Sequence, residues 1–314
     1  MPPSDDPIVT AAANVTHSNP PATQDLFRPS TSPASDEILR LLASAPVNTI
    51  TLVSLGPLTN YALAAAKDPV TFLRAKCLLV MGGAIDVPGN ITPVGEFNVL
   101  ADPIAAARVF ALSSPRPGST MPFSSLHPTA ETTLGPYPSA HDLGDRRLDI
   151  VIFPLDVTMT NMLRQHDFDG AANIMIDKGS PMAEWVAAFS RAAFIRNAEL
   201  QKGGEVETAL HDPLVVWYAL SAEEDIGWAV QERKDVRVET EGEWTRGMCV
   251  VDRRGRKLMA DKPDLGEREE VNADMGGWLS ESRGNRVGVC TRSPGDGKAL
   301  AKVLIERIFG SEKI

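Results

Sequence analysis

The sequence predicts an α/β fold: a mostly parallel, Rossmann-like open sheet flanked by helices. Segments of strand length at residues 48–56, 75–84 and 148–157 are apolar almost throughout, which is typical of strands buried on both faces of a sheet. Helical patterns at residues 56–69 and 101–114 alternate with them. Strands of this kind alternating with helices indicate a parallel sheet covered by helices on both sides.

The other elements follow from local apolar patterns and helix-capping signals. Residues 35–46 place their apolar side chains on one helical stripe, with Ser35 as a candidate N-cap and Pro46 just beyond the end. Further along, helical patterns occupy residues 180–200 and 211–221, a β-like stretch occupies 235–257, and a last helical pattern occupies 296–310.

Three stretches lack such patterns. Residues 1–35 are rich in Pro, Ser, Thr, Asn and Asp, so we expect an irregular N-terminal segment before a single domain at 36–314. Within that domain, a Pro-rich and Ser-rich insertion covers about residues 113–147. The charged, Gly-rich residues 254–288 are expected to form an exposed loop.

Composition and charge limit the possible partners. The 314 residues are 43% hydrophobic and 23% charged, as in an ordinary soluble protein large enough to bury a full core. A net charge of -10, spread along the chain, disfavours nucleic acid and anionic membrane surfaces as partners. Three widely spaced cysteines without a CxxC pair favour a reducing compartment. Because no leader-like segment or apolar stretch of about 18 residues occurs, we expect a cytoplasmic protein without a membrane partner.

The segment GNITPVGEFNVLADP, residues 89–103, is the first candidate ligand site. In sheets of this class ligands bind beyond the carboxyl ends of the strands, and the segment begins in one of the loops found there. If the chain is extended here, Glu96 and Asn98 project to one side and Phe97 to the other. With Asn90 they offer the carboxylate and amide groups that bind sugar hydroxyls. The alternative is structural: Asn90 follows a turn glycine, and Asn98 caps the next helix.

The dipeptide of His211 and Asp212 is the second candidate. Asp212 precedes Pro213, a helix-start pattern that would make Asp212 an N-cap. Its carboxylate could instead be an oxygen ligand for a hard cation. His211, beside a helix N-terminus, could act as an acid near neutral pH or be an ordinary satisfied histidine.

A third candidate is FPLDVTMTN, where Asp156 and Thr158 lie at a predicted strand end. A turn-capping aspartate is the simpler interpretation, so we assign this pair no first role. GxSxG, Walker A, HExxH and GxGxxG motifs do not occur, and a serine hydrolase or a Rossmann dehydrogenase therefore has no support.

Four stretches, in this order and at these separations, resemble the inosine-uridine-preferring nucleoside hydrolases, and more weakly a fungal branch of them. They are TLVSLGPLTNYALA, VMGGAIDVPGNITPVGEFNVLADPIAAARVF, FPLDVT and HDPLVVWYAL. The resemblance implies the nucleoside hydrolase fold and hydrolysis of the N-glycosidic bond of purine or pyrimidine ribonucleosides to ribose and free base, a salvage reaction. It also implies a Ca²⁺ ion beyond the strand ends and a homodimer or homotetramer.

The same resemblance implies a role for each candidate residue. His211 would protonate the leaving base, and Asp212 would bind both Ca²⁺ and the ribose diol. The main-chain carbonyl of Leu55 would be another calcium ligand. The ribose hydroxyls and the underside of the sugar would be contacted by Asn90, Glu96, Asn98 and Met81. An oxocarbenium-like transition state needs carboxylates near the sugar, an activated water and an acid at the leaving group.

The chain departs from the family near its start. Family members open with a strand and a DxDxxxDD turn that supplies most calcium ligands and the base that activates water, and this sequence has no such segment. Asp5 and Asp6 lack a preceding apolar strand, and Asn14 lies too close to GPLTN to be the family's early ribose-binding Asn. We therefore expect the first strand to be missing from the sheet. Since hard cations take about six to eight oxygens, we also expect Ca²⁺ binding to be weak or lost.

Two hypotheses from different classes follow. One is a nucleoside hydrolase represented by an N-terminally shortened chain. The other is a catalytically impaired or inactive family member, either a remnant that binds a sugar or a partner or the product of an incomplete gene model. The four motifs favour the first hypothesis, and the missing aspartate cluster favours the second.

Overall fold

The computed structural model describes residues 30–122, 134–139, 141–200, 203–260 and 274–310 of the 314-residue chain. Contacts within the chain divide it into two units, Met1–Pro33 and Ala34–Ile314, and all described helices and strands belong to the second unit. Several sequence-based predictions fall outside the described residues. They concern Asp5, Asp6, Asn14, most of the segment at 1–35, and parts of the stretches at 113–147 and 254–288.

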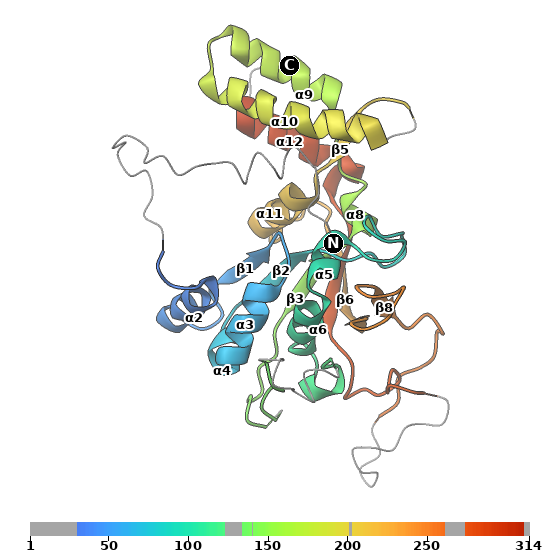
Figure 1. The fold of residues 1–314 in the computed structure, drawn as a ribbon. Coiled ribbons are helices and arrows are strands. Elements are labelled where there is room, and N and C mark those ends of the chain that lie inside the picture. The colour runs from blue at the N-terminus through green and yellow to red at the C-terminus, as the bar shows by residue number, and fades with distance from the viewer. Residues whose placement is uncertain (1–29, 123–133, 140, 201–202, 261–273, 311–314) are drawn as a thin grey trace, which may run out of the picture. The chain divides into compact units, whose positions relative to one another are not determined.

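A five-stranded sheet forms the centre of the second unit, in the order β1-β2-β3-β9-β6 (Figure 1). The strands are β1 Thr51–Ser54, β2 Cys77–Met81, β3 Ile150–Phe153, β9 Val287–Arg292 and β6 Ala229–Lys234. Strands β1, β2, β3 and β9 run parallel, with Val80 opposite both Ser54 and Ile152, while β6 pairs antiparallel with β9. The predicted α/β class with a mostly parallel sheet is confirmed.

Helices contribute to two hydrophobic cores, one for each face of the sheet. The first core contains side chains of α2 Ala34–Ser44, α3 Thr59–Lys67, α4 Pro69–Phe72 and α6 Pro103–Ala111. The second contains side chains of α8 Leu155–Thr158, α9 Gln165–Asp177, α10 Pro181–Leu200, α11 His211–Ser221 and α12 Ala299–Phe309. Along β2, Leu78 and Val80 join the first core and Leu79 and Met81 the second. Because both faces are buried, the strand has the continuous apolar sequence from which it was predicted.

Smaller elements complete the unit. They are α5 Phe97–Ala101, the 3₁₀ turns η1 Pro117–Ser119 and η2 Pro294–Gly297, and the antiparallel pairs of β4 Met162–Arg164 with β5 Glu207–Ala209 and of β7 Val236–Val238 with β8 Cys249–Val251. In Figure 1, α9, α10 and α12 gather together, and α11 lies between them and the strands β1 and β2. Within the described residues, no helix has both the length and the apolar character needed to cross a membrane.

Strand β9 and helix α9 were not predicted. Strand β9 begins at Val287, where we predicted the end of an exposed loop, and it lies between β3 and β6 in the sheet. That loop prediction was also wrong for several described residues, since Asp274 and Leu279 are 1% and 5% exposed. Asp274 pairs with Arg254 and accepts a hydrogen bond from the Leu279 amide, contacts that local composition does not reveal.

Candidate active site

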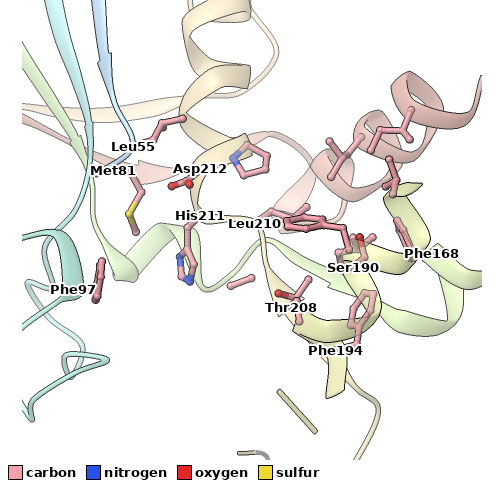
Figure 2. A pocket seen from close by; sticks show the side chains of 18 of the residues that line it. Leu55, Met81, Phe97, Phe168, Ser190, Phe194, Thr208, Leu210, His211 and Asp212 are labelled. Carbon is pink, nitrogen blue, oxygen red and sulfur yellow. The ribbon is translucent and has the colours of Figure 1, made fainter. Parts of the chain in front are cut away.

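A cavity of about 670 Å³ lies beyond the carboxyl ends of β1 and β2 (Figure 2). Its walls include the residue after β1, the end of β2 with the segment that follows, and the first turn of α11. Each of the seven residues assigned to the site from the sequence lines it: Leu55, Met81, Asn90, Glu96, Asn98, His211 and Asp212. Segments far apart in the sequence therefore converge on one space, whose volume is typical of small-molecule sites.

The loop between β2 and α5 is fixed by hydrogen bonds to its backbone. The Asp156 carboxylate, in the first turn of α8, accepts from the Ile85 and Asp86 amides at 2.9 and 2.7 Å. Gly89 packs against the other end of the loop, where a Cβ would lie 2.3 Å from the carbonyl oxygen of Gly95. Only glycine fits at that approach. Asp156 does not line the cavity, and it acts as an anchor for the loop that carries Asn90.

Glu96 is the N-cap of α5 and is 1% exposed. Its Oε1 accepts a hydrogen bond from the Asn98 amide at 2.9 Å, and its Oε2 accepts from the amides of Gly83 and Val99 at 2.8 and 3.1 Å. The predicted extended segment was wrong, because this carboxylate caps a helix that begins at Phe97. The alternative prediction, that Asn98 is the cap, was wrong for the same reason.

The side-chain amides of Asn90 and Asn98 each form hydrogen bonds to the protein through one of their two polar atoms. Asn98 Nδ2 donates to the Met81 carbonyl oxygen at 3.0 Å and lies 3.1 Å from the Met81 sulfur. Asn90 Oδ1 accepts from the Phe97 amide at 2.9 Å. Within the described part of the chain, neither the Asn98 oxygen nor the Asn90 amino group makes a hydrogen bond. These free ends are the groups that a ligand can use.

His211 is the first residue of α11, and its ring contacts Thr158 at the end of α8. The distance from Nδ1 to the Thr158 Oγ1 is 2.7 Å. Burial lowers the pKa of the imidazole, because the charged form loses solvation. His211 is therefore held by a specific partner and is not a freely solvated surface residue.

Asp212 lies in the first turn of α11 and is not its N-cap, a position that Leu210 occupies without a side-chain hydrogen bond. The predicted capping role was therefore wrong. No donor to the Asp212 carboxylate is found in the ranges that the structure describes. Burial raises the pKa of this carboxyl, and the nearby Glu96 carboxylate raises it further by repulsion. The carboxylate thus faces the cavity without compensation.

The other end of the cavity is apolar and was not predicted. It is lined mainly by residues of α9, α10 and α12: Phe168, Trp185, Val186, Phe189, Phe194, Leu304 and Ile308. The rings of Trp185 and Phe189 stack, with centroids 6.1 Å apart and planes 8° apart. Two aromatic residues spaced i, i+4 in an Ala-rich helix were the signal available in the sequence. Phe97, predicted to turn away, also lines the cavity.

The described residues do not by themselves fit a Ca²⁺ ion. Asp212 offers a carboxylate and Leu55 a main-chain carbonyl at the cavity, while the oxygens of Glu96 already accept three amides. No group of three or more His, Cys, Asp or Glu side chains suited to a metal occurs within residues 30–122, 134–139, 141–200, 203–260 and 274–310. This set is short of the roughly six to eight oxygens that Ca²⁺ takes.

The fold and the cavity define a class: α/β proteins that bind a small molecule beyond the carboxyl ends of parallel strands. The family follows from comparison of sequences. The model of the inosine-uridine preferring nucleoside hydrolase family matches residues 8–277, and the chain belongs to this family.

Two relatives of known sequence are similar to this chain over most of its length but over a smaller share of their own. The chain is 32% identical to protein C1683.06c of Schizosaccharomyces pombe over 222 residues, covering 70% of this chain and 56% of that protein. It is 30% identical to the pyrimidine-specific ribonucleoside hydrolase RihA of Salmonella typhi over 230 residues, covering 72% of this chain and 60% of RihA. The chain thus spans less than two thirds of these relatives.

Solved structures share the fold at lower identity. The plant nucleoside hydrolase PpNRh1 superposes with a TM-score of 0.61 at 22% identity, covering 93% of this chain and 71% of that one. The purine-preferring ribonucleoside hydrolase from Gardnerella vaginalis gives a TM-score of 0.57 at 20% identity, covering 91% of this chain and 68% of that one.

Proposed function

We propose that this chain binds ribonucleosides and hydrolyses their N-glycosidic bond, giving ribose and free base. The observation that carries the proposal is the convergence on one cavity of the two motifs, EFN and HD, to which the resemblance to the family assigns sugar and leaving-group roles. A cavity with polar groups at one end and an apolar, aromatic wall at the other suits a ligand made of a sugar and a flat base.

The groups that bind ribose follow from the hydrogen-bonding sites on Glu96, Asn98 and Asn90 that the protein itself does not use. A carboxylate has about four acceptor sites, and three on Glu96 are taken by amides, so one site on Oε1 accepts a ribose hydroxyl. Asn98 accepts through its free oxygen, and Asn90 donates through its free amino group. Met81, which is 3% exposed, gives the sugar an apolar floor. Each group in this arrangement has one direction of hydrogen bond to offer, which selects a diol in one orientation.

The reaction requires that the bond between C1′ and the base nitrogen breaks, with its electron pair leaving on the base. The neutral His211 ring donates a hydrogen bond from Nε2–H to the base nitrogen on which negative charge develops, since Nδ1 is held by Thr158. Positive charge develops on the sugar, and the uncompensated carboxylate of Asp212 stabilises it, together with Glu96. A water molecule then adds to C1′, and the proton that it loses ends on the departed base, so that the products are ribose and the neutral base.

We propose further that Ca²⁺ binds weakly, because the described residues supply few of its oxygens. The same shortage favours a second candidate function, which is binding of a nucleoside or of ribose without turnover. In that case Asn90, Glu96 and Asn98 retain the sugar, while Asp212 is the one described carboxylate lining the cavity that is free to assist water.

Ribose release from inosine and from uridine tests the proposal, measured with the purified chain at zero and millimolar Ca²⁺. We expect turnover that His211→Ala and Asp212→Ala abolish. His166→Ala is the matched control, because that histidine side chain is 88% exposed and does not line the cavity. Nucleoside binding by calorimetry without ribose release at any Ca²⁺ concentration would support the second candidate instead.

The proposal also includes the cellular location and the oligomeric state of the protein. We infer a cytoplasmic location, since Cys77, Cys249 and Cys290 carry free thiols. By similarity to the family we infer a homodimer or homotetramer, which light scattering on the purified chain tests.

A further inference from the structure

Within the described part of the chain, the His211 imidazole makes one side-chain hydrogen bond, between Nδ1 and the Thr158 hydroxyl at 2.7 Å. Thr158 is 0% exposed and does not line the cavity, whereas His211 does. The hydroxyl therefore contacts the ring from the protein side. The contact occupies Nδ1 and leaves Nε2 as the ring nitrogen that a ligand can reach.

The direction of this hydrogen bond follows from the burial of Thr158. A buried hydroxyl hydrogen needs an acceptor, and within the described residues the imidazole is the partner of this hydroxyl. When the Thr158 hydroxyl donates to Nδ1, the proton of the neutral ring must be on Nε2. The burial of Thr158 therefore favours the tautomer of His211 that carries its proton on Nε2.

The turn that carries Thr158 also holds the backbone beside His211. The Leu210 amide donates to the Asn161 carbonyl oxygen at 2.8 Å. Asn161 is itself 0% exposed, and its side chain donates to the Val157 carbonyl at 2.9 Å and accepts from Ser293 at 3.0 Å. Residues 158–161 therefore hold both the main chain before His211 and its side chain, which fixes where the ring lies.

We propose that Thr158 is a positioning residue: its hydroxyl donates to Nδ1 of His211, fixes the Nε2–H tautomer, and directs that N–H toward the leaving base. The consequence for turnover rests on the proposed function. The tautomer and the ring position do not, so they can be tested in a chain with no activity. A hydroxyl at this place is the required chemistry, and serine should therefore substitute for threonine.

Long-range ¹H–¹⁵N NMR of the imidazole nitrogens tests the tautomer at a pH where the ring is neutral. We expect the Nε2–H form in the wild-type chain and in Thr158→Ser, and a mixture with a substantial Nδ1–H population in Thr158→Val, which keeps the shape and removes the hydroxyl. Thr160→Val is the matched control, since Thr160 lies on the same turn and bonds to the Val157 carbonyl and to Asn161 rather than to the imidazole. That variant should keep the wild-type tautomer.

Kinetics provide the second measurement. We expect Thr158→Val to lower kcat about tenfold with KM changed less than about twofold, and Thr158→Ser to restore kcat. A wild-type ring in the Nδ1–H form, or a folded Thr158→Val chain with the wild-type tautomer, would overturn the proposal. If Thr158→Val does not fold, the wild-type spectrum alone decides. If no variant turns over while the tautomers behave as expected, the positioning role stands and the proposed hydrolysis fails.

Discussion

Glu96 and Asp212 are two carboxylates that line one cavity, and they differ in the hydrogen bonds that the protein makes to them. Glu96 is 1% exposed and accepts three backbone amides, so it is part of the fold before any ligand arrives. The Asp212 carboxylate has no donor among the described residues, and the pKa of its carboxyl is raised by burial and by Glu96. The Glu96 carboxylate thus has a structural role, and the Asp212 carboxylate is free to interact with a ligand.

The residues of the site fall into two groups, one on the side of Glu96 and one on the side of Asp212, which differ in how the chain brings them together. Met81, Asn90, Glu96 and Asn98 come from one continuous stretch of chain. Asn98 bonds to Met81 and Glu96, and Asn90 bonds to the Phe97 amide within the same stretch. Leu55, His211 and Asp212 come from segments that only the sheet brings together. Substitutions on the first side should therefore lower both stability and ligand binding, whereas substitutions on the second side should act mainly on ligand binding and turnover, with smaller effects on stability.

The largest effect is expected for Glu96→Ala. Removing the carboxylate leaves the amides of Gly83, Asn98 and Val99 without an acceptor in a buried place, which we expect to cost about 3 kcal/mol of unfolding free energy. Urea denaturation measures this. Glu96→Gln keeps one acceptor oxygen and should lose less.

Asp102→Ala is the matched control for that prediction. Asp102 caps α6 by accepting from the Ala105 amide and lies outside the cavity. Its loss should cost about 1 kcal/mol, as for an ordinary N-cap, and leave nucleoside binding intact. Equal costs for Glu96→Ala and Asp102→Ala would show that the carboxylate of Glu96 is no more than a helix cap.

The second prediction concerns Asp212→Ala. Because this carboxylate makes no hydrogen bond among the described residues, the unfolding free energy should change by less than about 0.5 kcal/mol. Ribose release should fall by at least about a hundredfold, since the variant loses its free carboxylate beside the developing positive charge. Parallel denaturation and turnover assays separate the two effects. A loss of stability as large as that of Glu96→Ala would remove the contrast between the two sides.

The fold class could be predicted from the sequence because several strands of the sheet have a strong local pattern. The apolar runs of β2 and β3 are continuous because both faces are buried, and they were recognised, as was the half-buried edge strand β1. Strand β9 follows a long charged stretch and was missed, although Val287 pairs with Ile150 of β3. Its burial depends on pairing with β3 and β6, which lie far away in the sequence, and no local pattern reports this pairing.

The candidate site shows the same limit. The seven residues assigned from motifs line one cavity, while their roles remain predictions. Their local geometry was predicted wrongly: Glu96 is the cap of α5, and Asp212 caps nothing. Capping depends on which side chain meets a helix start in three dimensions, and the local sequence did not distinguish Glu96 from Asn98 as the cap of α5. The contact of His211 with Thr158 joins elements 53 residues apart and has no signature in the sequence.

The third prediction uses the pH dependence of stability at His211. Burial lowers the pKa of this imidazole below its unfolded value of 6.5, so the folded state resists protonation. Its contribution to stability is complete above 6.5 and is lost as pH falls toward and through the lowered pKa. Denaturation at pH 7.5 and pH 5 should show a loss that His211→Asn removes. His166→Asn, at a side chain that is 88% exposed, should leave the loss unchanged.

The smallest effect is expected for Asp212→Asn, and its sign is opposite to that at His211. The folded pKa of Asp212 is raised above 3.8, so the carboxyl favours the native state when it is protonated, and this contribution is lost as pH rises through the folded pKa. At pH 3 the variant and the wild type should be equally stable, and at pH 7 the variant should be slightly more stable. Because Asp212 is partly exposed, solvent screens the effect and only its direction is predicted. Millimolar Ca²⁺ at pH 7 should reverse the order, since a cation bound by the carboxylate stabilises the wild type and gains nothing comparable from the amide. Equal responses of the two chains to Ca²⁺ would mean that Asp212 is free for the sugar and not for a metal.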